Sequence, residues 1–200
     1  MTAKSNLVSF RFIGNLNDIE SVKYLADLIG RYCNVKILDL ELAIIDKQSR
    51  YWKFKSKTLK YTDNNLTKLG EIYKDAAGKQ IEVSFELSTP LKNWEFRSRD
   101  IDASVNVGLS GNINSLNFVI NSEHLIEPSW AVFIKDILGF LKTKACQVLY
   151  GFVFQMDNIK MPAFYIEGIK SEYLTPEESQ KAINWSRNKK HCGIKMWDVF

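Results

Sequence analysis

The sequence predicts an α+β protein with a largely antiparallel sheet and about four helices. Three observations predict this class. Several segments alternate apolar and polar residues, as half-buried strands do. Others repeat their apolar residues at helical spacing. Finally, Ser-Gly-Asn at 110–112 separates two alternating segments, which indicates a β-hairpin and interrupts the strict strand–helix rhythm of a doubly wound parallel sheet.

Composition and length favour one domain over residues 1–200. Hydrophobic residues make up 46% of the 200 residues, enough for a sizeable core, and no Pro/Gly/Ser-rich linker or fixed-period repeat divides the chain. The N-terminus lacks the apolar stretch of a secretory signal, and the longest mostly apolar run, 145–156, is too short to cross a bilayer. We therefore expect a cytoplasmic protein with no membrane partner.

The three cysteines lack a CxxC pair, so they indicate neither a zinc site nor a disulfide framework. We expect buried thiols, no metal and no cofactor. The net charge of +4 is too small to indicate a nucleic-acid partner by itself.

Alternation of apolar and polar residues predicts the strands. The clearest lies at 81–87, where four apolar residues alternate with polar ones, so that one face is buried and the other is solvated. The segment 50–61 is expected to be either a strand or an extended loop. The same pattern predicts further strands at 7–13, 35–45, 103–109, 113–120, 146–155 and 193–200.

Apolar residues at helical spacing predict the helices. The first is expected over 18–33, with Asn17 and Glu20 as a capping-box pair. The second begins at Asp63 and ends before Gly78. The third follows Pro128 and has the widest apolar stripe, and the fourth follows the Thr175-Pro176 cap and runs to about residue 188. The stripe of the third helix consists of Trp130, Phe133, Ile134, Ile137, Leu138 and Leu141.

The segment 50–60 combines lysines and aromatic residues in alternation. On a strand, three lysines would share one face, with Trp52 and Phe54 on the other: Lys53, Lys55 and Lys57. Such a row, extended by Lys60, can contact phosphates, but stacking on bases requires aromatic residues on the same face. The alternative is an edge strand whose lysines discourage aggregation. Both interpretations stay open.

The polar loop at 92–100 is a second candidate surface. It combines two aromatic residues with two arginines, the composition of a protein-binding hot spot. A satellite cluster that packs under a long loop is the alternative. The residues of this candidate partner-binding surface are Trp94, Phe96, Arg97 and Arg99.

Catalytic candidates are few. His191 and Cys192 are adjacent on an expected strand, so their side chains would point to opposite faces and make a poor dyad. His124 with a buried cysteine stays open. The carboxylate pairs Glu82–Glu86 and Asp100–Asp102 fit the solvated faces of strands. No G-x-S-x-G, P-loop or G-x-G-x-x-G motif occurs, so we assign no catalytic residue and expect a protein that is not an enzyme.

Four segments occur in order in the C-terminal third: Tyr150-Gly-Phe-Val-Phe-Gln155, Phe164-Tyr-Ile-Glu-Gly-Ile169, Trp185 and Gly193-Ile-Lys-Met-Trp-Asp-Val-Phe200. This order resembles the C-terminal part of an uncharacterised group of bacterial cytoplasmic proteins. The succession of a Trp-bearing helix and a strand with Tyr150-Gly151 also resembles immunity proteins of bacterial polymorphic-toxin systems. The resemblance implies a non-catalytic protein that binds and occludes a cognate toxin, and it implies no residue roles.

Three functional hypotheses therefore stand. The first is an immunity protein whose partner is a toxin. The second is a nucleic-acid-associated protein that uses the basic segment 50–60, in particular Lys53, Lys55, Lys57 and Lys60. The third is an enzyme with a dispersed site, built around His124 or a carboxylate.

Overall fold

The computed structural model describes most of the chain in separate stretches: residues 5–48, 53–89, 103–108, 113–121, 124, 130–156, 176, 180 and 198–199. Its three helices are α1 (Ile19–Cys33), α2 (Asp63–Ala76) and α3 (Trp130–Thr143). Its strands are β1 (Ser5–Ile13), β2 (Asp39–Asp46), β3 (Lys53–Lys60), β4 (Ile81–Ser88), β5 (Ala103–Gly108), β6 (Asn114–Asn121), β7 (Gln147–Met156) and β8 (Asp198–Val199).

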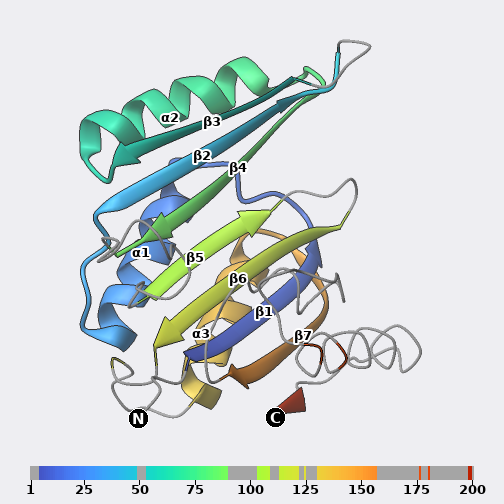
Figure 1. Cartoon of the computed structure of the whole chain (residues 1–200). Coiled ribbons are helices and arrows are strands. Elements are labelled where there is room, and N and C mark those ends of the chain that lie inside the picture. Colours follow the sequence, from blue (N-terminus) through green and yellow to red (C-terminus); the bar gives the residue numbers. More distant parts are fainter. Residues whose placement is uncertain are drawn as a thin grey trace.

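These strands form one sheet in the order β3-β2-β4-β5-β6-β1-β7-β8 (Figure 1). All the described pairings are antiparallel except that of β7 with β8, which is parallel. The predicted α+β class with a largely antiparallel sheet is thus confirmed. The predicted hairpin agrees with the antiparallel pairing of β5 and β6, although its turn at 110–112 lies outside the described residues.

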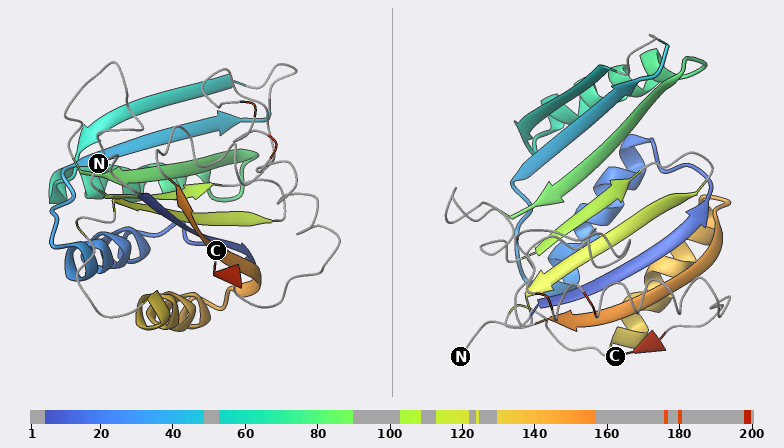
Figure 2. Two further views of the ribbon diagram at one scale, coloured as in Figure 1. Left: turned by 60° about the horizontal axis from the view of Figure 1, so that its bottom comes forward. Right: turned by 45° about the vertical axis from the view of Figure 1, so that its right-hand side comes forward.

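All three helices lie on one face of the sheet (Figures 1 and 2). The helix α2 runs behind the β3–β2–β4 end, α1 behind the middle, and α3 behind β1 and β7. We call the side on which these helices lie the helix face, and the other side, which carries none of them, the open face. Because side chains alternate along a strand, every second residue of each strand points toward the helices.

A continuous apolar row crosses the helix face. Cross-strand partners share a face, so the register links one residue of each strand from β1 through β6, β5 and β4 to β2. Each member is at most 1% exposed: Phe10, Leu116, Val107, Phe85 and Leu42. On β3 the row ends differently, because the partner of Leu42 is Lys57. The alternation predicted for β1 is confirmed, with Val8, Phe10 and Phe12 fully buried.

The helices α1 and α3 pack against each other through aromatic side chains. Tyr24 stacks on Phe140 with ring centroids 4.2 Å apart, and Phe133 meets the edge of Tyr32 at 5.1 Å. The Tyr32 hydroxyl donates a 2.8 Å hydrogen bond to Asp136. The apolar stripe predicted for α3 is confirmed at its buried members, Phe133, Ile134, Ile137 and Leu141.

The start of the first helix differs from the prediction by one residue. Asp18, not Asn17, is the N-cap, and its carboxylate accepts hydrogen bonds from the Ser21 amide and hydroxyl. Asp18 also pairs with Lys144, at 2.8 Å. Burial alone raises the pKa of Asp18, but the hydrogen bonds from Lys144 and Ser21 outweigh burial and hold the pKa below its ordinary value. Lys144, which is distant in sequence, thus stabilises the ionised form of Asp18 that caps the helix.

One strand boundary and the number of helices also differ from the prediction. The strand expected at 35–45 is β2, which begins at Asp39, so Leu38 precedes it and is 37% exposed. Of the fourth predicted helix only Pro176 and Gln180 are described, both as helical, so the described part of the chain contains three helices against about four expected. None of the described helices combines the length and the apolar character needed to cross a bilayer.

Candidate functional site

The strand β3 forms one end of the described sheet and is exposed along almost its whole length. It pairs with β2 over its whole length. Seven of its eight residues are exposed and only Leu59 is half-buried. The segment 50–61, predicted as a strand or an extended loop, is therefore a strand from Lys53 onward.

Three lysines of β3 share the helix face, as the alternation predicts. We call them the lysine row: Lys53, Lys55 and Lys57. Their cross-strand partners on β2 are Asp46, Ile44 and Leu42 in the same order. Successive lysines of the row are about 6.7 Å apart along the strand. Within the described part of the chain, none of the three forms an ion pair, although the carboxylate of Asp46 belongs to the residue that faces Lys53, so the row carries a net positive charge.

The fourth predicted lysine, Lys60, lies on the opposite face of β3. It forms a 2.6 Å ion pair with Asp39, its partner on β2. The predicted basic set is therefore divided. Lys60 is paired and belongs to the open face, whereas the lysine row stays on the helix face.

Phe54 also lies on the open face and is 65% exposed. Trp52, the other aromatic residue of the segment, is outside the described residues. The expected separation of lysines and aromatic residues is confirmed for Phe54. Since Phe54 and the lysine row are on opposite faces of the strand, bases bound along the lysines could not stack on this ring.

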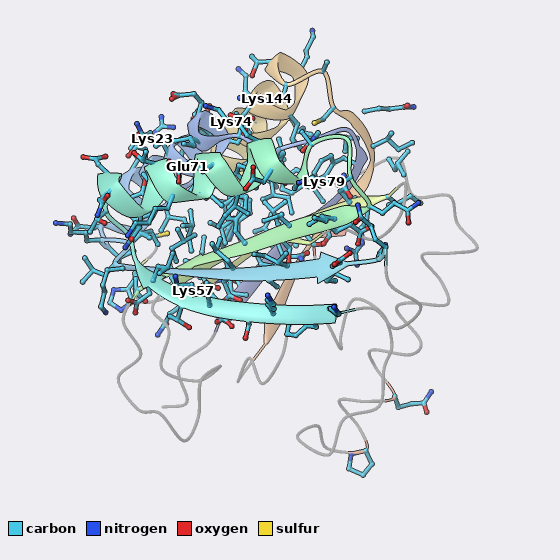
Figure 3. All side chains as sticks on the ribbon, turned by 90° about the horizontal axis from the view of Figure 1, so that it is seen from above. Lys23, Lys57, Glu71, Lys74, Lys79 and Lys144 are labelled. Atoms are coloured by element: carbon cyan, nitrogen blue, oxygen red, sulfur yellow. The ribbon has the colours of Figure 1, made fainter. Side chains whose placement is uncertain are left out.

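Positive charge is concentrated around this end of the sheet. Residues 53–79, which include β3 and α2, contain seven lysines and three carboxylates, a net charge of +4. The whole chain also has a net charge of +4, so the remaining residues balance to zero. Figure 3, which looks onto this end from above, shows Lys57 on β3 below α2, and Glu71 and Lys74 on the helix.

The open face carries a polar row that sequence reasoning did not identify. Ser9 of β1 donates a 2.7 Å hydrogen bond to Asn117 of β6, whose amide group lies 3.5 Å from Asn106 of β5. The Ser9 side chain is fully buried. The sequence shows these polar residues at alternate positions of three predicted strands. It does not show that they lie side by side, because that depends on the register of the strands.

The carboxylate pair Glu82–Glu86 lies on the same open face. Glu82 forms an ion pair with Lys47. Glu86 lies between Asn106 of β5 and Glu41 of β2 in the register. The two residues of the predicted pair therefore have different neighbours and lie in separate cross-strand rows. Asp100 and Asp102, the other predicted pair, are outside the described residues.

Two cysteines are buried, as predicted. Burial raises the pKa of Cys33 to about 12 and also raises the pKa of Cys146, so both sulfurs are thiols and weak nucleophiles at neutral pH. His124 is half-buried in the structure, whereas His191 and Cys192 are not described. Within the described stretches, no group of three or more His, Cys, Asp or Glu side chains could hold a metal ion.

The candidate loop at 92–100 lies entirely outside the described residues. The structure therefore does not place Trp94, Phe96, Arg97 or Arg99, and their role stays a prediction. The lysine row with the neighbouring Phe54 is the candidate site that the described residues define.

Comparisons of the chain with protein-family models, with curated proteins and with solved structures found no match.

Proposed function

We propose that this chain is a non-catalytic binding protein that neutralises a partner protein by occlusion, and that the lysine row is part of its contact surface. The observation that carries the proposal is an exposed strand at the end of the described sheet, with three lysines that form no described ion pair on one face and an exposed Phe54 on the other. The partner would be a toxin, as the resemblance of the C-terminal third to immunity proteins implies.

The chemistry of the surface indicates an acidic partner. Exposed ion pairs contribute only about 0.2 to 1 kcal/mol each, so three lysines serve mainly to orient the partner and to accelerate association. Affinity additionally requires a buried anchor, and an exposed aromatic ring on the other face of the same strand can supply one. Phe54 is the described residue that fits this role.

This chemistry also narrows the class of toxin. A nuclease binds a phosphate backbone through basic side chains around its active site. The lysine row would be repelled from such a site. The occluded surface would therefore carry carboxylates around the active site or beside it.

Co-expression tests this proposal. The chain is produced together with the toxic domain encoded by a neighbouring gene, and growth rescue and co-elution in size exclusion are measured. We expect rescue and a stoichiometric complex. The variant K53E/K55E/K57E should weaken both, since it reverses the charge of the row.

The matched control is K68E/K74E/K79E, which makes the same change of charge on and after α2. It should retain the complex. Absence of a complex with the wild-type chain would remove the proposal, and equal losses for the two triple variants would show that net charge, not the lysine row, controls association.

Nucleic-acid binding is the second candidate function. The concentration of positive charge in residues 53–79 favours it, and the position of Phe54 on the opposite face disfavours base stacking. It predicts retardation of short oligonucleotides that weakens steeply with salt. Oligonucleotides that remain unbound at low salt would exclude this function.

A further inference from the structure

We propose that the partner inserts an extended acidic segment that pairs, as an additional strand, with the side of β3 on which no described strand lies, placing carboxylates at every second position opposite the lysine row. This inference rests on the proposed function and specifies the form in which the partner is recognised. It follows from the regularity of the edge, the charge along it and the residues on its open face.

The edge is regular along its full length. β3 pairs with β2 in eight consecutive positions without a shift of register, whereas the β1–β7 pairing is interrupted between Arg11 and Phe12. The strand contains no proline. Backbone N–H and C=O groups along such an edge form a template for another strand, and bulges and prolines are the usual means of blocking it. Within β3 neither occurs, and its lysines are the feature that discourages unspecific pairing.

The lysine row matches the spacing of a paired strand. Two strands have the same rise per residue, so carboxylates at every second position of an added strand stay aligned with Lys53, Lys55 and Lys57. Opposite charges on directly facing residues stabilise a strand pair. The edge thus disfavours an apolar strand and favours an acidic one.

The residues on the open face of β3 indicate which side chains the added strand would carry between its acidic positions. Side chains between the acidic positions would point toward the same side as Phe54, Ser56 and Thr58. Phe54 is 65% exposed, and Ile45 is its partner on β2. A β-branched or aromatic residue facing Phe54 would extend this apolar contact. The expected segment therefore alternates acidic and apolar residues.

A second copy of the chain is a poorer occupant of this edge. In an antiparallel β3–β3 pair the helix faces of both sheets lie on the same side, so the two lysine rows would face each other. Like charges on directly opposite residues destabilise a strand pair. The same charges attract an acidic strand.

Binding of designed peptides tests the inference. The probe is a fluorescent capped peptide as long as β3 that alternates Glu and Val. The control has the same composition with its Glu residues in one block. Fluorescence anisotropy at low salt should show the alternating peptide binding at least about tenfold more tightly. The variant K53E/K55E/K57E should lose this binding, and K68E/K74E/K79E should retain it.

Backbone methylation separates strand pairing from charge attraction. Alternate N–H groups of a strand point to opposite edges. Two peptides are therefore N-methylated, one at the Glu positions and one at the Val positions. Only the peptide whose methyl groups face β3 should lose binding, and loss by neither would overturn the inference.

The outcomes distinguish this inference from the proposed function. Equal binding of the alternating and block peptides, or a toxin complex without any peptide binding, would overturn strand addition and leave the binding function in place. If neither peptide nor toxin binds, the proposed function and strand addition both fail. Protection of the strand against aggregation is then the remaining interpretation of the lysines. Tighter binding of an oligonucleotide than of either peptide would also reject the acidic strand as the occupant.

Discussion

The centre of the sheet and its β3 end use the same face in opposite ways. In β5, β6 and β1 the apolar residues on the helix face are fully buried, whereas three of the four corresponding positions of β3 are exposed lysines. The centre is covered by α1 and α3, whereas α2 runs behind the β3–β2–β4 end, where Leu42 of β2 is buried and the facing Lys57 of β3 is exposed (Figure 2). Alternation therefore assigns residues to a face, and the position of the strand within the sheet decides whether that face becomes a core.

The largest expected contrast between the two regions is in apolar packing. Phe118 of β6 is fully buried and meets Phe133 edge to face, with ring centroids 5.1 Å apart. Phe118→Ala should lower the free energy of unfolding by about 3 to 5 kcal/mol, because it removes these contacts and leaves a cavity. Urea denaturation measures the loss.

Phe54→Ala is the matched control at the edge. Since Phe54 is mostly exposed, its replacement should change the free energy of unfolding by no more than about 0.5 kcal/mol. Similar losses for both variants would contradict the contrast between centre and edge.

A polar substitution probes the open face in the same way. Asn117→Ala removes the acceptor of the hydrogen bond from the fully buried Ser9 hydroxyl. We expect a loss of about 1 to 3 kcal/mol, the cost of an unsatisfied buried polar group. Thr58, in the same cross-strand row but exposed on β3, serves as the control. Urea midpoints that fall equally in Asn117→Ala and Thr58→Ala would show that burial does not distinguish the two regions.

The N-caps of α1 and α2 allow a finer comparison. Asp18→Ala should cost about 0.5 to 2 kcal/mol at neutral pH, and Thr62→Ala a smaller amount, since the Thr62 hydroxyl accepts a longer bond of 3.4 Å. The folded-state pKa of Asp18 is below its ordinary value of 3.8. Its electrostatic stabilisation is therefore present above about pH 3.8 and is lost as the pH falls through the folded pKa.

Urea denaturation at pH 7 and at a pH below the folded pKa of Asp18 measures this effect. The difference between wild type and Asp18→Ala should shrink in acid, whereas the difference for Thr62→Ala should not. A pH-independent difference for Asp18→Ala would mean that its charge contributes nothing to the cap.

The smallest expected effect on stability is at the lysine row itself. Replacement of Lys53, Lys55 and Lys57 by alanine should change the free energy of unfolding by less than about 0.5 kcal/mol, because these side chains are exposed and form no described ion pair. Sedimentation should instead reveal more self-association, because the edge loses its charges. A stability loss above about 1 kcal/mol would show that the row supports the fold.

Much of the local structure could be predicted from the sequence. Alternation placed Val8, Phe10 and Phe12 on a buried face, and it placed the lysine row opposite Phe54. Periodicity predicted the α3 stripe, and the two described cysteines are buried as expected. These features follow from the strand and helix periods, which depend on residues close together in the chain.

Only the tertiary structure decided the strand order and the neighbours of each polar residue. Asn15, Asn17 and Asp18 all have side chains that can cap a helix, and Asp18 is the one that also pairs with Lys144, 126 positions away. Ser9, Asn106 and Asn117 come from three separate segments and meet only through the register. Likewise, β3 ends the described sheet because β2 is the one described strand that pairs with it. Such pairings depend on how the whole chain packs, and no local period encodes them.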